Sequence, residues 1–135
     1  MKKSAVVVLL LSITTVLHAQ VPQMINYQGR VTVAGTNFDG TGQFQFALVD
    51  SAGTTNYWSN DGTPTGEPAT AVSLTVTKGL YAVLLGDTNL LNMAQAIPPE
   101  AFTNADVRLR VWFNDGVSGL QQLTPDQRLA AVGYA

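Results

Sequence analysis

The segment Ile-Asn-Tyr-Gln-Gly-Arg-Val-Thr-Val, residues 25–33, decides the fold of this chain. Its odd-numbered positions hold Ile, Tyr, Gly, Val and Val, whereas its even-numbered positions hold Asn, Gln, Arg and Thr. Side chains on a β-strand alternate between two faces, so one face here is apolar or small and the other is wholly polar. The pattern predicts a strand that lies against a core on one side and faces water on the other.

Six further segments have strand patterns of their own. Stretches rich in Gly, Asp, Asn and Pro separate them, and these residues favour turns. The further predicted strands are 41–49, 56–59, 71–77, 80–85, 106–114 and 120–123. Short, regularly spaced strands in one small domain are typical of a sandwich. We therefore predict an all-β fold, a single antiparallel β-sandwich of about seven strands.

Three segments carry more specific expectations. Residues 80–85 are apolar on both faces, which predicts a central strand or one that is covered on its outer side. Residues 90–96 contain helix formers with apolar side chains at helical spacing, and two prolines follow. We therefore expect one short helix in a loop, or a turn, that plugs one end of the core. Thr124 with Gln127 three residues later forms a capping-box pattern around Pro125, which predicts a helical turn.

The first 19 residues have the composition of a secretory signal peptide. Two lysines precede an apolar run, which ends at the small residue Ala19 before Gln20. The run is about 14 residues long, whereas a membrane-spanning helix needs about 20. We therefore expect a cleaved signal peptide over 1–19 rather than a membrane anchor, and a β-sandwich domain over 20–135. The mature chain would be extracellular, at the cell surface or in the periplasm.

The composition of residues 20–135 argues against several classes of binding and catalytic site. They contain five basic side chains against nine acidic ones, which gives a net charge of −4, and they contain no cysteine. A mildly acidic chain is a poor binder of nucleic acid. The only histidine, His18, lies in the predicted signal peptide. A mature chain without His or Cys lacks the side chains of Ser-His-Asp and Cys-His nucleophiles and of the usual zinc sites.

Carboxylates remain as possible ligands or catalysts. Asp39, Asp50, Asp61 and Asp115 each fall in a predicted turn near a glycine, and clustered loop carboxylates bind calcium in other proteins. Turns are also where Asp is most commonly used for local structure. The acids are spread singly, without the pair of carboxylates that a glycosidase needs. We expect no cofactor, no metal site and no catalytic residues.

Aromatic and arginine side chains give the candidate binding residues. Arg108, Arg110 and Trp112 alternate along the outer face of their predicted strand, where the Trp ring would stack on a sugar or a partner aromatic group. In the alternative, a second layer or the C-terminal residues cover that ring. Tyr57 and Trp58 are adjacent, so one faces inward and the other outward. Either residue is a core anchor or a sugar platform.

Two segments resemble a known family. Ile-Asn-Tyr-Gln-Gly-Arg-Val at 25–31 resembles the Ile-Asn-Tyr-Gln-Gly-Arg-Leu opening of an N-terminal module in secreted bacterial surface and tail-fibre-like proteins. Leu-Thr-Pro-Asp-Gln-Arg-Leu at 123–129, with Gly-Tyr-Ala at 133–135, resembles its closing Leu-Thr-Pro-Arg-Gln-Arg-Leu…Pro-Tyr-Ala. Asp126 replaces a basic residue and Gly133 a proline. The resemblance implies a β-sandwich that precedes a repetitive stalk, with no catalytic residues to assign.

Together these observations favour a secreted, non-enzymatic structural or interaction module of a bacterial envelope or fibre-like extracellular protein. The alternative is a carbohydrate-binding β-sandwich that uses exposed Trp and Tyr side chains. A small hydrolase that uses only carboxylates is a third hypothesis. The expected partners are a second copy, a C-terminal stalk region or glycans, with no nucleic acid and no stable membrane span. We also expect Val132 and Tyr134 to pack on the sheet or on a partner.

Overall fold

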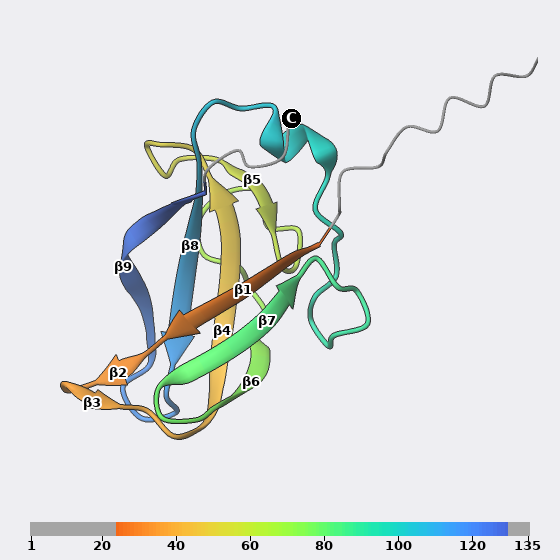
Figure 1. The fold of residues 1–135 in the computed structure, drawn as a ribbon. Coiled ribbons are helices and arrows are strands. Elements are labelled where there is room, and N and C mark those ends of the chain that lie inside the picture. The colour runs from red at the N-terminus through yellow and green to blue at the C-terminus, as the bar shows by residue number, and fades with distance from the viewer. Residues whose placement is uncertain (1–23, 130–135) are drawn as a thin grey trace, which may run out of the picture.

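The computed structural model describes residues 24–129, which form nine strands and one 3₁₀ helix. The predicted signal peptide, Val132 and Tyr134 lie outside the described residues. The elements are β1 (Ile25–Arg30), β2 (Thr32–Val33), β3 (Thr36–Asn37), β4 (Gly40–Val49), β5 (Asn56–Ser59), β6 (Val72–Val76), β7 (Leu80–Leu85), η1 (Pro99–Phe102), β8 (Val107–Asn114) and β9 (Leu120–Leu129) (Figure 1). The predicted all-β fold is confirmed.

A five-stranded antiparallel sheet forms the larger layer. Its central strand is β4, which pairs with β8 on one side. On the other side, β6 pairs with residues 40–44 of β4 and β5 pairs with residues 47–49. β9 pairs with the outer edge of β8. The strands β1 and β7 pair with each other and form the second layer, which crosses obliquely over the larger sheet (Figure 1).

The core lies between these two layers. Alternate side chains of β4, β6, β7 and β8 point into it and are buried. Phe44 of β4 joins the layers, because its ring centroid lies 4.3 Å from that of Tyr81 on β7 and 5.0 Å from that of Phe113 on β8. Burial of such large apolar side chains supplies most of the favourable free energy of folding, about 1.5–3 kcal/mol for each fully buried Phe or Leu.

Gly29, in the middle of the first motif, makes room for Tyr81. The two residues are direct partners across β1 and β7. A Cβ atom built on Gly29 would lie less than 3.0 Å from three ring or hydroxyl atoms of Tyr81, closer than real Cβ atoms come to other atoms. The ring therefore lies across the glycine backbone, an arrangement known to compensate for glycine in a strand. From there the Tyr81 ring reaches Phe44 in the opposite layer.

The first strand is shorter than the strand predicted at 25–33. β1 ends at Arg30, and the two-residue strands β2 and β3 form a separate small ribbon. The break falls at Val31, whose N–H donates to the carbonyl of Gly79 (2.7 Å) while its own carbonyl accepts from the N–H of Phe38 (3.2 Å). The first bond continues the register of β1 with β7, but the Val31 carbonyl and the Gly79 N–H both bond Phe38 instead of each other, and the ladder ends there. This break and the extra β3 account for nine strands instead of seven.

Of the short helix or turn predicted at 90–96, the structure forms the turn and not the helix, and Met93 and Ile97 around it are buried in the core. That segment consists of a turn and extended chain, and the 3₁₀ helix η1 begins later, with Pro99 at its first position. The N–H of Ala94 donates to the carbonyl of Asn60 (2.6 Å) instead of the carbonyl of Leu90 that an α-helix requires. A hydrogen bond to a distant segment has therefore replaced the local one.

The helical turn predicted after Thr124 is also wrong, because β9 runs through this segment as a strand. Leu123 and Gln127 of β9 pair with successive core-facing residues of β8, so three residues between them stand opposite Arg110. Such an irregularity is a β-bulge on an edge strand. A proline, which has no N–H to donate, is tolerated there, and Pro125 occupies this position.

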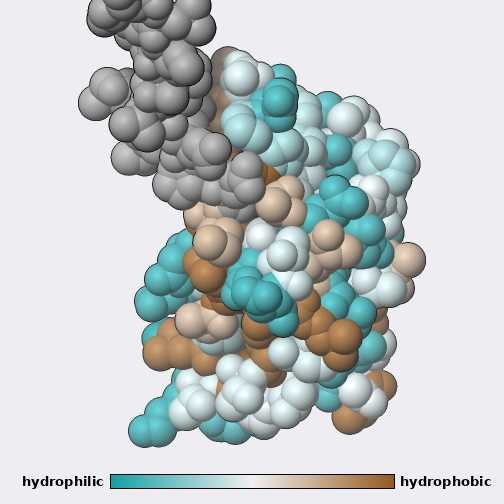
Figure 2. Space-filling view, turned by 90° about the vertical axis from the view of Figure 1, so that its right-hand side faces the viewer, coloured by the Kyte–Doolittle hydropathy of each residue, from teal (hydrophilic) through white to brown (hydrophobic). Residues whose placement is uncertain are grey.

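The outer face of β7 is exposed, contrary to the prediction that it is central or covered. Leu80 and Leu84 are 53% and 37% exposed. Seen from the right-hand side of Figure 1, the surface carries several hydrophobic patches that polar residues separate (Figure 2). The strand is apolar on both faces, but it belongs to a two-stranded layer with only one buried face.

Replacing Gly29 with Ala should lower the free energy of unfolding by about 1–3 kcal/mol, the usual effect of overpacking, because the new Cβ meets the Tyr81 ring. Urea unfolding of the mature chain measures this. Gln28→Ala, on the polar face of the same strand, is the matched control and should change stability by less than about 0.5 kcal/mol. Gly29→Ala should cost much less in a Tyr81→Ala background. An equal loss in both backgrounds would contradict the packing.

Candidate functional site

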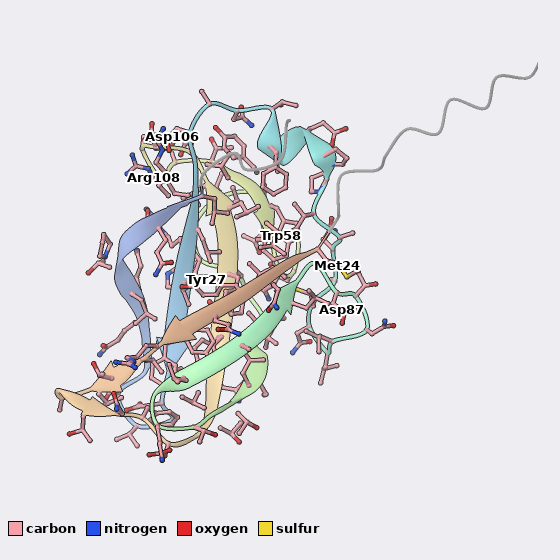
Figure 3. All side chains as sticks on the ribbon, viewed as in Figure 1. Met24, Tyr27, Trp58, Asp87, Asp106 and Arg108 are labelled. Carbon is pink, nitrogen blue, oxygen red and sulfur yellow. The ribbon has the colours of Figure 1, made fainter. Side chains whose placement is uncertain are left out.

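A cleft of about 290 Å³ opens between the two layers, and β1 and β9 contribute to its walls. Its lining comes from the first motif, from β7 and β8, and from the second motif. The lining residues are Tyr27, Arg30, Val31, Thr32, Tyr81, Leu109, Val111, Leu123, Thr124, Pro125 and Gln127. Tyr27 is labelled in Figure 3. None of the lining residues is acidic.

The two segments that carry the family resemblance stand on opposite walls of this cleft. Tyr27 and Arg30 come from the first segment, near the start of the domain. Thr124, Pro125 and Gln127 come from the second, near its end. The floor between them is apolar and continuous with the core, because Leu109 and Val111 of β8 also belong to the buried cluster. The fold thus brings two distant motifs to one place.

The strand edges at the two walls differ in their protection. β9 carries the bulge and Pro125, features that discourage pairing with a further strand. β1 has six residues without a proline or a bulge, and in residues 24–129 it pairs with β7 alone. Alternate residues of such an edge point their backbone N–H and C=O groups away from the sheet. The wall formed by β1 is therefore open to pairing.

The hydroxyl group of Tyr81, which lines the cleft, is neutral. Burial, and to a smaller extent the neighbouring Tyr27, raise the pKa of Tyr81 well above its usual range. The phenol consequently stays protonated at any physiological pH and is not a general base. Together with the amide of Gln127 and the hydroxyl of Thr124, it equips the cleft for hydrogen bonding rather than for proton transfer.

Trp58 is a core residue. Its ring is 4% exposed and lies in the cluster between the layers (Figure 3). Its indole N–H donates to the carbonyl of Gln95 (2.8 Å), which holds the loop after β7 against the sheet. Tyr57, its neighbour, is half-buried against the same cluster. The structure therefore places Trp58 as the core anchor that the sequence offered as one alternative.

Trp112 lies on the outer face of the five-stranded sheet, and its ring is covered. It is 5% exposed and packs with Ala47 and Val49 of β4, with Leu120 beside them. The structure thus brings it into a small second cluster on the far side of the sheet from the cleft. Neither tryptophan presents the exposed flat ring that stacking on a sugar requires.

Arg108 and Arg110 are each paired with a carboxylate. Arg110 forms a two-pronged pair with Asp126, at 2.9 Å from Nε to Oδ1 and 2.7 Å from Nη2 to Oδ2. Hydrogen bonding to Asp126 raises the pKa of Arg110. Arg108 pairs with Asp106 at 3.1 Å, at one end of the sandwich (Figure 3). Asp126, which departs from the family pattern, thus has a structural partner, and neither guanidinium is left free for an anionic ligand.

The turn carboxylates bind their own loops. Asp50 accepts from the N–H of Thr54 (2.7 Å), and Asp115 accepts from the N–H of Ser118 (2.7 Å). Asp39 accepts from the N–H of Lys78 (2.6 Å), where it ties one turn to another. Between residues 24 and 129, no three His, Cys, Asp or Glu side chains are grouped so that they would hold a metal ion. Within the same residues no helix has the length and apolar character needed to cross a membrane.

Asn60 is the structural residue that sequence reasoning missed. Its side chain is fully buried, and its Oδ1 accepts from the N–H of Phe46 (3.0 Å). Its Nδ2 donates to the carbonyls of Thr70 (2.9 Å) and Asn92 (3.1 Å). The side chain thereby joins β4 to the two longest loops. In the sequence this residue opens an Asn-Asp-Gly turn signal, and nothing in that signal distinguishes a buried asparagine from an exposed one.

Asp61, the next residue, organises the loop between β5 and β6. Its Oδ1 accepts from the N–H and hydroxyl of Thr63 (3.0 and 2.7 Å), and its Oδ2 accepts from the N–H groups of Ala69 (2.7 Å) and Thr70 (2.9 Å). Burial raises the pKa of this carboxyl, but the hydrogen bonds outweigh it and lower the pKa from 3.8 to about 2.

The charged form of Asp61 should therefore stabilise the fold in a pH-dependent way. Its folded-state pKa lies below the unfolded value, so its contribution is complete above about pH 5 and is lost as the pH falls towards about 2. Asp61→Asn should lower the free energy of unfolding at pH 7 by about 1–2 kcal/mol and flatten its decline below pH 5. Urea titrations across this range measure both effects. Glu67→Gln, which removes one exposed negative charge from the same loop, is the matched control and should change stability at pH 7 by less than about 0.5 kcal/mol. An unchanged slope for Asp61→Asn would contradict the assignment.

A family model described as a domain of unknown function, DUF8740, matches residues 26–126. No curated protein and no solved structure matches the chain. The matched range begins in β1 and ends in the bulge of β9, so it includes Tyr27 and Arg30 of one wall of the cleft and Thr124 and Pro125 of the other. The chain therefore belongs to the DUF8740 family of domains of unknown function.

Proposed function

We propose that this domain is a secreted, non-enzymatic structural or interaction module of a bacterial envelope or fibre-like extracellular protein. In this proposal it acts by docking polypeptide, not by turning over a substrate. The observation that carries it is the cleft between β1 and β9. There an unprotected strand edge stands over an apolar floor, and the lining includes no carboxylate. These features suit an extended chain, which supplies backbone hydrogen bonds and apolar side chains.

The use of the polar side chains supports the same proposal. The side chains that are best suited to chemistry are engaged in holding the fold together. Asp61 and Asn60 order loops, and Arg110 is paired with Asp126. In the cleft, the raised pKa of Tyr81 leaves a neutral phenol. An enzyme needs groups poised to gain or lose protons near the working pH.

The secretion part of the proposal is supported by the N-terminal sequence and by the resemblance. The leader has the charge and apolar length of a signal peptide. The cysteine-free mature chain would depend on its core for stability, and the buried cluster between the layers is extensive. The resemblance to N-terminal modules of secreted surface proteins points the same way. Carbohydrate recognition has less support, since both tryptophans are buried.

A single preparation tests this proposal. The full chain is expressed with its leader in a bacterium, and the exported protein is purified. Mass spectrometry should show Gln20 as the first residue. The purified domain should then be inactive across a panel of glycosidase, esterase and peptidase substrates and should give no signal on a glycan array.

Two results would contradict the proposal. One is retention of uncleaved protein in the cytoplasm, and the other is reproducible turnover of any substrate on the panel. A glycan signal that Tyr57→Ala removes from a still cooperatively melting protein would favour the carbohydrate-binding alternative. Leu91→Ala is the matched control for that variant, because Leu91 is 84% exposed and should not alter glycan binding.

A further inference from the structure

The second layer of the sandwich is too narrow to cover the first. It has two strands, whereas the sheet beneath it has five. The strip of the larger sheet beside β1 is the floor of the cleft, which Val111 of β8 and Leu123 of β9 line. One more strand beside β1 would lie over this strip and pair with the backbone groups that β1 leaves unpaired within residues 24–129.

The segment that follows β9 has the chemistry of such a strand. Residues 130–135 read Ala-Ala-Val-Gly-Tyr-Ala and carry no charged side chain. In an extended chain Val132 and Tyr134 share one face, while Ala131 and Gly133 share the other. One face is thus large and apolar, as the cleft floor requires, and the other is small.

The segment also starts in the right place. It leaves β9 at Leu129, which pairs with Val107 and packs against the core. Six extended residues span about 20 Å. If two of these residues form a turn, the remaining four extend over about 13 Å. The chain covers the same length along β9 between Leu123 and Gln127, two residues of the cleft lining.

We propose that residues 130–135 turn back after β9 and add a strand along the free edge of β1, with Val132 and Tyr134 over the cleft floor. This inference rests on the proposed function, that the cleft docks polypeptide, and names the polypeptide as the chain's own continuation. The added strand closes the open side of the sandwich and clamps the segment leaving the domain to the strand that opens it.

Disulfide trapping tests the proposal, because the chain has no cysteine of its own. Gly133→Cys is combined in turn with Asn26→Cys, Gln28→Cys and Arg30→Cys, which cover the possible registers on the outer face of β1. Directly opposite residues on paired strands bring their Cβ atoms within disulfide range. Oxidation should give a cross-linked monomer for at least one pair. Gly133→Cys with Thr75→Cys, on the opposite edge of the large sheet, is the control and should cross-link at least ten-fold less.

The outcomes separate this inference from the proposed function. If the β1 pairs gave a cross-linked dimer, the proposal that residues 130–135 dock on their own chain would be overturned. The cleft would still be a polypeptide-binding site, filled by a second copy of the chain. No preference over the Thr75→Cys control would overturn the inference.

Hydrogen exchange gives a second measurement on nearly native chains. Val132→Asp should reduce the protection of β1 amides at least ten-fold, whereas Ala131→Asp, on the opposite face of the added strand, should leave it within about two-fold. Equal effects of the two variants would count against the added strand.

Discussion

The packing of the Tyr81 ring across Gly29 is the constraint on which the rest of this structure depends. A two-stranded layer is marginal by itself in water, so β1 and β7 need a strong attachment to the larger sheet. The buried β7 side chains Tyr81, Val83 and Leu85 make that attachment, and Tyr81 reaches Phe44 because Gly29 leaves the space free. Because this layer has only two strands, it also leaves the cleft beside β1. The attachment of β1 and β7 to the larger sheet therefore positions the candidate site.

The sequence predicted most of the strands, because strands that bury one face repeat every two residues. β4, β7 and β8 lie within one residue of their predicted bounds. The failures have a common cause in long-range pairing. Asn60 takes the Ala94 N–H that a helix needed, and β8 draws the capping-box segment at Thr124 into β9. Local signals cannot show which distant backbone group competes for a hydrogen bond.

The candidate site was less predictable than the fold. The sequence singled out Trp58, Trp112, Arg108 and Arg110, residues whose types are often used in binding. Their roles depend on their hydrogen-bond partners, such as Asp126 for Arg110 and the backbone carbonyl of Gln95 for Trp58. The cleft itself depends on topology, since the order β5-β4-β8-β9 is what brings the last strand beside the first. The two segments that carry the family resemblance contribute residues to both walls of the cleft, but the resemblance did not indicate that the fold brings these segments together.

The most direct test of this account is the nuclear Overhauser contact between Gly29 and Tyr81 in the mature protein. A ring lying across the glycine backbone predicts strong cross-peaks between the Gly29 α-protons and the Tyr81 ring protons. It also predicts that the ring current shifts at least one α-proton well upfield. This shift should persist in Tyr81→Phe, which keeps the ring, and should disappear in Tyr81→Ala. Gly29 α-protons at ordinary shifts, without cross-peaks to Tyr81, would contradict the account.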